Sequence, residues 1–292
     1  MNPYAKLIST LSLLLGTTIT ISSNHWVMAW TGLEINTLAI IPLISKSHHP
    51  RAIEATIKYF LVQATASALL LFSSMSNAWA TGQWDITQLT HPMSCLLLTV
   101  AIAMKLGLVP FHFWFPEVLQ GSSMTTALIL STVLKFPPIT ILFLTSHSLN
   151  PTLLTTMAIT SAALGGWMGL NQTQIRKILA FSSISHMGWM TIITIYNPNL
   201  TLLTFYLYTL MTSTVFLTFN ATKVLKLATM MTSWTKTPML NATLMLTLLS
   251  LAGLPPLTGF LPKWLIIQEL TKQEMTVAAT IMASLSLLGL FF

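Results

Sequence analysis

The segment GLVPFHFWFPE, residues 107–117, recurs in altered form as GLPPLTGFLPK at residues 253–263. Gly, Leu, Pro and Pro match at one constant offset, since 253 minus 107 is 146, which is half of the 292 residues. Each copy interrupts a long apolar segment with two prolines six residues apart. Because proline lacks a backbone N–H and clashes with the preceding turn, we expect both segments to be broken helices.

The composition places these two segments in a membrane. Hydrophobic residues make up 53% of the chain and charged residues 7%, whereas about a quarter of a soluble domain is charged. Because a span needs about 20 apolar residues, the length allows about ten helices and no separate catalytic domain outside the membrane. The net charge of +7 would suggest nucleic acid in a soluble protein. Here it reflects the bias of the loops, and we expect no nucleic-acid partner.

Broken helices have a particular meaning at membrane depth. Backbone groups that are freed there must be satisfied by protein or water, so such a break usually lines a cavity. Paired interruptions at matching positions of two halves are the sequence sign of a transporter's central pathway. The alternative is that both breaks are packing kinks without further function. We favour the pathway.

The apolar runs predict an all-α polytopic membrane protein with about ten transmembrane helices, of which the fourth and ninth are broken. The expected spans are residues 3–22, 24–45, 54–76, 93–120, 124–147, 152–170, 177–196, 199–221, 239–270 and 275–292. The chain ends at Phe292 inside an apolar run, and we therefore expect further residues to follow it.

The distribution of charge tests this order of spans, because basic residues gather on the inner side of a membrane. The face that carries the N-terminus receives Lys6, Lys46, Arg51, Lys58, Arg176, Lys177, Lys223, Lys226 and Lys236. The opposite face receives Asp85, Glu269, Lys272 and Glu274. An inner N-terminus is therefore supported by a pattern that is independent of hydropathy.

The positions of the broken spans also predict the symmetry of the chain. Since they are the fourth and the ninth, the repeat is five helices long, and an odd number sends the second copy into the membrane from the other side. The sequence thus predicts two inverted repeats, residues 1–147 and 152–292, with a pathway near their interface. Outside the motif the copies differ, because positions 34, 105 and 135 correspond to Ala180, Leu251 and Ile281. We expect the symmetry to be architectural and not chemical.

Four ionisable residues remain at membrane depth once the loop charges are set aside. Glu34 lies near the middle of the second span, and Lys105 lies two residues before the first break. Lys135 is central in the fifth span, and Lys263 lies at the second break. A charge at the bilayer centre costs at least about 2.5–3.5 kcal/mol, so these groups indicate a function. The alternatives are snorkelling to an interface, which applies best to Lys263, and salt bridges for packing, although three lysines share one carboxylate.

Proton transfer is the chemistry that suits these groups. A buried lysine holds or releases its proton according to whether a carboxylate is close. His112, inside the first break, and His186, among the serines of the seventh span, could relay protons because imidazole titrates near neutrality. A hydrogen bond to a neighbouring helix explains each histidine equally well.

No cofactor or metal is expected in this chain. The histidine spacing does not match a metal or haem site. The single cysteine, Cys95, excludes an internal disulfide and an iron–sulfur cluster held by this chain alone. We expect Cys95 to be a small buried apolar residue.

Together these features resemble the antiporter-like subunits of respiratory complex I. The resemblance rests on a glutamate in an early span, a lysine ahead of the first break, the run QIRKILAFSSISHMG at residues 174–188, and the second break with its lysine. It covers essentially the whole chain. The short N-terminus is similar to that of the animal mitochondrial members of the family.

The resemblance implies a core membrane-arm subunit in the mitochondrial inner membrane, with its basic face and N-terminus toward the matrix. Such a subunit takes part in proton translocation coupled to electron transfer from NADH to ubiquinone. It belongs to a proton-translocating NADH:ubiquinone reductase but carries no redox centre, so NADH, FMN, iron–sulfur clusters and ubiquinone would be bound elsewhere in the complex. The implied partners are the other membrane-arm subunits and phospholipids.

The resemblance also implies a role for each buried ionisable group by its motif position. Glu34 and Lys105 would form the coupling pair, Lys135 the central relay, and Lys263 the group of the second half-channel. The two histidines, His112 and His186, would bridge between them. Two rival functions remain: a free-standing cation/proton antiporter, and a structural scaffold subunit without its own proton path. One carboxylate at depth suits a metal cation poorly, because metal cations prefer several oxygen ligands.

Overall fold

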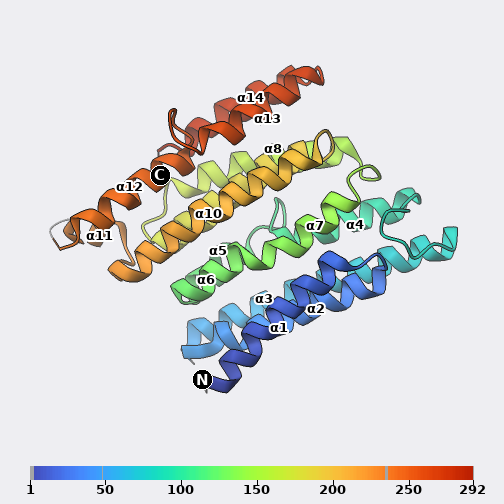
Figure 1. The fold of residues 1–292 in the computed structure, drawn as a ribbon, viewed down its shortest axis with the longest axis horizontal. Helices are drawn as coiled ribbons and strands as arrows, with labels where there is room; N and C mark the ends of the chain where they lie inside the picture. The colour runs from blue at the N-terminus through green and yellow to red at the C-terminus, as the bar shows by residue number, and fades with distance from the viewer. Residues whose placement is uncertain (1–2, 48, 234–235, 292) are drawn as a thin grey trace. The chain divides into compact units, whose positions relative to one another are not determined.

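The computed structural model describes residues 3–47, 49–233 and 236–291. Over these residues the chain forms helices and connecting loops, and the strand-like pairing is confined to isolated bridges between loops. The helices are α1 (Pro3–Ser22), α2 (Trp26–Ile44), α3 (Pro50–Thr81), α4 (Pro92–Leu106), α5 (Trp114–Gly121), α6 (Met124–Ser131), α7 (Phe136–Leu144), α8 (Pro151–Gly169), α9 (Ile175–Ile193), α10 (Pro198–Thr222), α11 (Leu227–Ser233), α12 (Pro238–Ala252), α13 (Phe260–Lys272) and α14 (Thr276–Leu288), with 3-10 turns at Ser45–Ser47 and Val133–Lys135. The all-α prediction is confirmed (Figure 1).

Several of these helices are long and apolar enough to cross a membrane. Among the described residues they are Pro3–Ser22, Trp26–Ile44, Pro50–Thr81, Met124–Leu144 and Pro198–Thr222, and shorter apolar helices occupy Pro92–Leu106, Pro238–Ala252 and Thr276–Leu288. Large apolar side chains such as Leu15 and Leu217 are exposed along them, which suits contact with lipid. The chain is a multi-pass membrane protein.

The chain divides into two compact units. The first comprises residues 1–126 and 133–151, and the second comprises residues 127–132 and 152–292. The predicted repeat boundaries at residues 147 and 152 stay a prediction. Each unit is described separately below.

In the first unit, α1 and α2 pack closely along their length (Figure 1, blue). Glycines make this approach possible. A Cβ added to Gly16 would lie 2.9 Å from the carbonyl oxygen of Gly32, and one added to Gly32 would lie 2.9 Å from the carbonyl oxygen of Gly16. Small residues at a helix crossing allow such close backbone contact in membranes. Helix α3 then packs against α2, α4 and α5, and α7 packs against α1 and α4.

Both predicted helix breaks are present. Helix α4 ends at Leu106 and α5 begins at Trp114, while α12 ends at Ala252 and α13 begins at Phe260. The two ends differ by 146 (252 minus 106), and so do the two restarts (260 minus 114). The starts of α4 and α12, which are both prolines, differ by the same 146 (238 minus 92). The constant offset seen in the sequence motif therefore extends to both bounds of the helix before each break and to the start of the helix after it.

The two breaks begin with the same helix ending. Gly107 and Gly253 lie in the left-handed region, with φ of 74° and 85°, a conformation that glycine adopts without steric cost. Leu108 then donates its N–H to the carbonyl of Ala103 at 2.9 Å, and Leu254 donates to Leu249 at 3.4 Å. This is the Schellman ending, which satisfies carbonyls that the broken helix leaves open.

Paired loops form at one end of each unit. The α1–α2 loop meets the α3–α4 loop, where Trp26 N–H donates to Trp84 at 3.1 Å and Ile86 N–H donates to Asn24 at 3.0 Å. In the second unit, the α8–α9 loop meets the α10–α11 loop through two backbone bonds of 3.3 Å, Ile175 to Leu225 and Leu227 to Thr173. The sequence did not predict these bridges. The helices of each unit are thus tied by main-chain bonds as well as by packing.

The fifth predicted span departs from a regular helix. It was expected to be continuous over residues 124–147, but α6 and α7 are separated by the 3-10 turn Val133–Lys135. Pro137 and Pro138 follow this turn and lack the N–H groups that would bond the carbonyls of Val133 and Leu134. The α-helical pattern therefore cannot continue through Lys135. Helix α11, in the loop before α12, was also not predicted.

Candidate proton path

The first part of the candidate path is a pair of opposite charges from α2 and α4. Lys105 lies on the last turn of α4 with 5% of its surface exposed, and Glu34 on α2 is half-buried. The two interact electrostatically. Neither the Lys105 Nζ nor the Glu34 Oε2 has a hydrogen-bond partner among the described residues. The structure therefore places near one another the two groups that the family resemblance implied as a pair.

Tyr59 adds a phenol beside this pair. It lies on α3 with 2% of its surface exposed, interacts electrostatically with Glu34, and meets the Trp114 ring edge-on at 5.8 Å between centroids. Sequence reasoning missed Tyr59. A tyrosine in an apolar run carries no local signal that separates a buried phenol near a carboxylate from one at a membrane interface.

Lys135 is held against the first break. Its surface is 3% exposed, and its Nζ lies 4.5 Å from the centroid of the Phe115 ring. Phe115 belongs to the first turn of α5, immediately after the break. An ammonium over an aromatic face is attracted by the ring quadrupole, with an energy of about 2 kcal/mol when the pair is desolvated. The sequence placed Lys135 at depth but gave no indication of this aromatic contact.

His112 lies within the first break and is buried, with 1% of its surface exposed. Its ring is 4.2 Å from the Phe113 ring and near the carbonyl of Pro110. Neither ring nitrogen makes a hydrogen bond of good geometry to the described residues. A buried imidazole whose nitrogens make no such hydrogen bond is normally satisfied by water or by a proton-exchanging partner. The predicted alternative, a hydrogen bond to a neighbouring helix, is not seen for His112 within the part of the chain that the structure describes.

In the second unit, Lys263 and His186 face the same space. They line a cavity of about 70 Å³ together with Ser182, Ser185 and Ser286. A smaller cavity of about 20 Å³ is also lined by both, and there Thr204 and Tyr208 supply hydroxyls. Apolar side chains such as Trp189 complete the lining of both cavities, and cavities of these sizes with several polar partners accommodate water.

Two further contacts fix the groups around these cavities. The Lys263 Nζ donates a hydrogen bond of 2.7 Å to the carbonyl of Ala252 and lies 5.9 Å from the centroid of a Trp189 ring. The His186 ring lies 5.4 Å from the ring of Tyr208. The hydroxyls, the imidazole and the ammonium are thus polar groups gathered in the cavity lining among apolar side chains.

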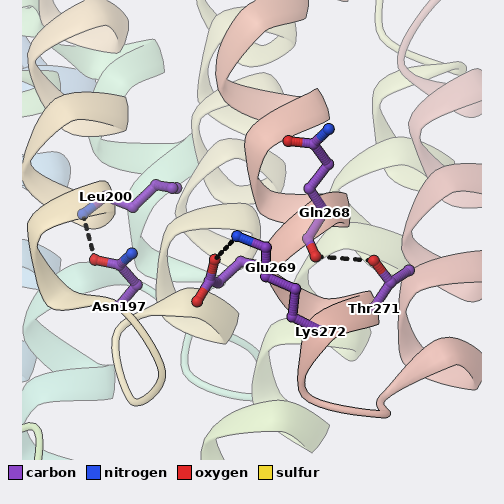
Figure 2. A network of polar contacts seen from close by, with 6 residues as sticks. All are labelled: Asn197, Leu200, Gln268, Glu269, Thr271 and Lys272. Atoms are coloured by element: carbon purple, nitrogen blue, oxygen red, sulfur yellow. Dashed lines mark hydrogen bonds and ion pairs between the residues drawn. The ribbon is translucent and has the colours of Figure 1, made fainter.

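Among the described residues, three other ion pairs join charged side chains of α3, α5 and α13. Lys58 contacts both Glu54 and Glu117, and the distance to Glu117 is 2.7 Å. Glu117 is the positional counterpart of Lys263 at the offset of 146 (263 minus 117), but its environment is different. In the second unit, Glu269 accepts a bond of 3.4 Å from Lys272 near the end of α13 (Figure 2). Exposed pairs of this kind are screened by solvent and contribute little to stability. They do not belong to the buried path.

The described residues contain no cluster of three or more histidine, cysteine, aspartate or glutamate side chains suited to a metal ion. Cys95 is buried on α4, with 7% of its surface exposed, as the sequence predicted.

Comparisons with known proteins place the chain among membrane transporters and oxidoreductases. The family model described as "NADH:quinone oxidoreductase/Mrp antiporter, TM" matches residues 23–289. NADH-ubiquinone oxidoreductase chain 2 of Struthio camelus is 82% identical over 292 residues, which are 100% of this chain and 84% of the relative. The protein of the same name from Gallus gallus is 79% identical over the same shares of the two chains.

Solved structures agree with this assignment. A chain in the structure of respiratory complex I from Thermus thermophilus with bound aureothin superposes with a TM-score of 0.92 at 28% identity, over 100% of this chain and 69% of that chain. A chain of the Mrp complex from Dietzia sp. DQ12-45-1b gives a TM-score of 0.88 at 18% identity, over 97% of this chain and 58% of that chain, and shows a shared fold. The resemblance to antiporter-like subunits of complex I is thereby confirmed, and the chain belongs to the NADH:quinone oxidoreductase/Mrp antiporter family.

Proposed function

We propose that this chain is a membrane-arm subunit of respiratory complex I and takes part in proton translocation while NADH reduces ubiquinone elsewhere in the complex. The names of its relatives support the assignment to complex I. The observation that carries the proton path is the interacting pair Glu34–Lys105, at the point where α4 breaks. Because charges at membrane depth carry an energetic cost, a pair of opposite charges beside an interrupted helix supports a functional role.

The first unit would load and relay the proton. A proton that reaches the Glu34 carboxylate weakens its attraction for the Lys105 ammonium, and the lysine can then pass a proton on. Lys135, seated over Phe115, would receive it, with His112 in the break as an intermediate carrier. Water would supply the remaining links along this path.

The second unit would take the proton through the water-sized cavities around Lys263 and His186. The serine and threonine hydroxyls that line them can orient a chain of waters. No redox chemistry is assigned to this chain. NADH, FMN, iron–sulfur clusters and ubiquinone would be held by other subunits, and the exposed apolar helix faces would contact membrane-arm partners and phospholipids.

The finer architecture that fits this function is a pair of inverted five-helix repeats with broken fourth and ninth spans. Two observations support it. The starts of α4 and α12, their ends, and the starts of α5 and α13 each differ by 146 (238 minus 92), and corresponding loops are bridged in each unit. The proposed location is the mitochondrial inner membrane, with the N-terminus in the matrix, in line with the basic face predicted from the sequence.

Impermeant labelling of single cysteines tests this topology. In a Cys95→Ser background, Asn24→Cys in the α1–α2 loop is expected to react from the intermembrane space. Asn171→Cys, in the corresponding α8–α9 loop, is expected to react only from the matrix side. Both asparagines are exposed in the chain, so they form a matched pair. Labelling of both from the same side would rule out inversion.

Purification and reconstitution test the function itself. When the chain is captured from mildly solubilised mitochondria, NADH:ubiquinone reductase activity is expected to co-purify in stoichiometric amount. The chain reconstituted alone into liposomes is expected to give no cation-driven proton flux. Robust sodium- or potassium-driven proton exchange by the isolated chain would instead assign it as a free-standing antiporter.

A further inference from the structure

The second break contains a contact that has no equivalent in the first. In a continuous helix the carbonyl of Ala252 would accept the N–H of residue 256, but residue 256 is proline and has none. The Lys263 Nζ donates to this carbonyl at 2.7 Å, from the first turn of α13 back to the last residue of α12. The lysine side chain thus supplies the hydrogen bond that Pro256 cannot give to the Ala252 carbonyl.

The first break is closed by different chemistry. There the indole Nε1 of Trp114 donates to the carbonyl of Met104 at 3.2 Å. The counterpart of Lys263 is Glu117, whose carboxylate is 2.7 Å from Lys58. An ionised carboxylate cannot donate a hydrogen bond to a carbonyl. The donor at the second break, the Lys263 ammonium, is therefore titratable. The donor at the first break, the Trp114 indole N–H, is not.

Gly253 provides the space for this contact. A Cβ at this position would lie 2.9 Å from both the Cδ and the Nζ of Lys263. At Gly107, which has nearly the same backbone conformation, a Cβ would meet Trp114 and Phe115 at 3.6 Å, an ordinary contact distance. The left-handed helix ending requires glycine at both positions, but only at Gly253 does the missing side chain also make room for an ammonium.

We infer that Gly253 and the Ala252 carbonyl are positioning elements for Lys263, and that the lysine exchanges its proton by moving away from this carbonyl within the cavity that Ala252, Lys263 and His186 all line. The inference rests on the proposed function of Lys263. The charged ammonium donates more strongly to a carbonyl than the neutral amine does. A protonated Lys263 is therefore held at Ala252, and a deprotonated one is free to turn toward the water of the cavity.

The test compares Gly253→Ala with Gly107→Ala in the assembled complex, with proton-to-electron ratios normalised to the amount of complex. Both variants place alanine at a left-handed helix end, so they share the backbone strain. Gly253→Ala is expected to reduce occupancy of the lysine–carbonyl contact about tenfold, the loss that follows from removing one hydrogen bond to a charged group. Its ratio should fall toward that of Lys263→Ala, whereas Gly107→Ala should affect the amount of complex and not the ratio.

A structure of the Gly253→Ala complex gives the second readout. The Lys263 Nζ is expected beyond hydrogen-bond distance of Ala252, with the helix break unchanged. Equal ratios for the two glycine variants, or a lysine still bonded to Ala252 in the variant, would overturn the positioning role while leaving the proton path intact. A full ratio in Lys263→Ala would overturn the proposed path in this unit, and the positioning role with it.

Discussion

Replacement of Lys105 by methionine is expected to remove this subunit's contribution to the proton-to-electron ratio and to slow coupled NADH oxidation at least about tenfold, in line with the loss of a proton-transferring group. Methionine fills a similar volume without charge or a donor. Lys105 is 5% exposed and is the cation that interacts with Glu34. Its loss leaves the carboxylate without that charge and interrupts the relay at its first step.

The matched control is Lys6→Met, because Lys6 is exposed near the start of α1 and has no part in the path. Proton pumping and NADH oxidation should both be normal in this variant. Glu34→Gln should resemble Lys105→Met, and the double variant should lose no more than either alone, since the two groups act as a unit. If Lys105→Met pumps with the full ratio in an assembled complex, the chain is a scaffold and its buried charges are incidental.

The largest effect on stability is expected from Gly259→Ala. A Cβ at Gly259 would overlap the carbonyl oxygen of Ser250 and approach its carbonyl carbon to 2.6 Å. These are backbone atoms of α12 that cannot rotate away, so α13 must separate from α12. Overpacking of this kind costs typically 1–3 kcal/mol and here should reach at least the upper part of that range, about 3 kcal/mol.

Gly289→Ala is the control for this substitution. Gly259 has φ −71° and ψ −14°, and Gly289 has φ −69° and ψ −13°, so alanine is equally compatible with the two backbones. The nearest contact at Gly289 is the carbonyl oxygen of Ser286 at 3.4 Å. In native gels, Gly259→Ala should yield much less assembled complex, and in thermal unfolding it should unfold at a lower temperature. Gly289→Ala should be near normal in both measurements. Equal stability of the two variants would show that α12 and α13 separate at little cost.

The fold could be predicted from the sequence wherever one local cause dominates. Prolines and glycines at residues 107–117 and 253–263 have strong steric effects, and both helix breaks were predicted from them. The long apolar runs likewise gave most helices to within a few residues. The prediction of a continuous span was wrong at Lys135, because Pro137 and Pro138 remove the helical hydrogen bonds of the turn before them.

Contacts between distant residues could not be predicted in the same way. The sequence identified the buried ionisable groups because charges in an apolar run are conspicuous. It did not identify Tyr59 beside Glu34, Phe115 under Lys135, or the Ala252 carbonyl that Lys263 reaches. Aromatic residues are abundant in membrane spans, and every residue has a carbonyl. Only the packing of the helices decides which of them a lysine meets.

The loop bridges of the two units have a consequence for the divergence of the chain. The bonds at Trp26 and Ile86, and those at Ile175 and Leu227, join main-chain groups. Every amino acid except proline offers these groups, so replacement of one side chain by another leaves the pairing intact. Two halves with unrelated side chains can therefore retain one backbone plan, while their interiors evolve separate chemistries.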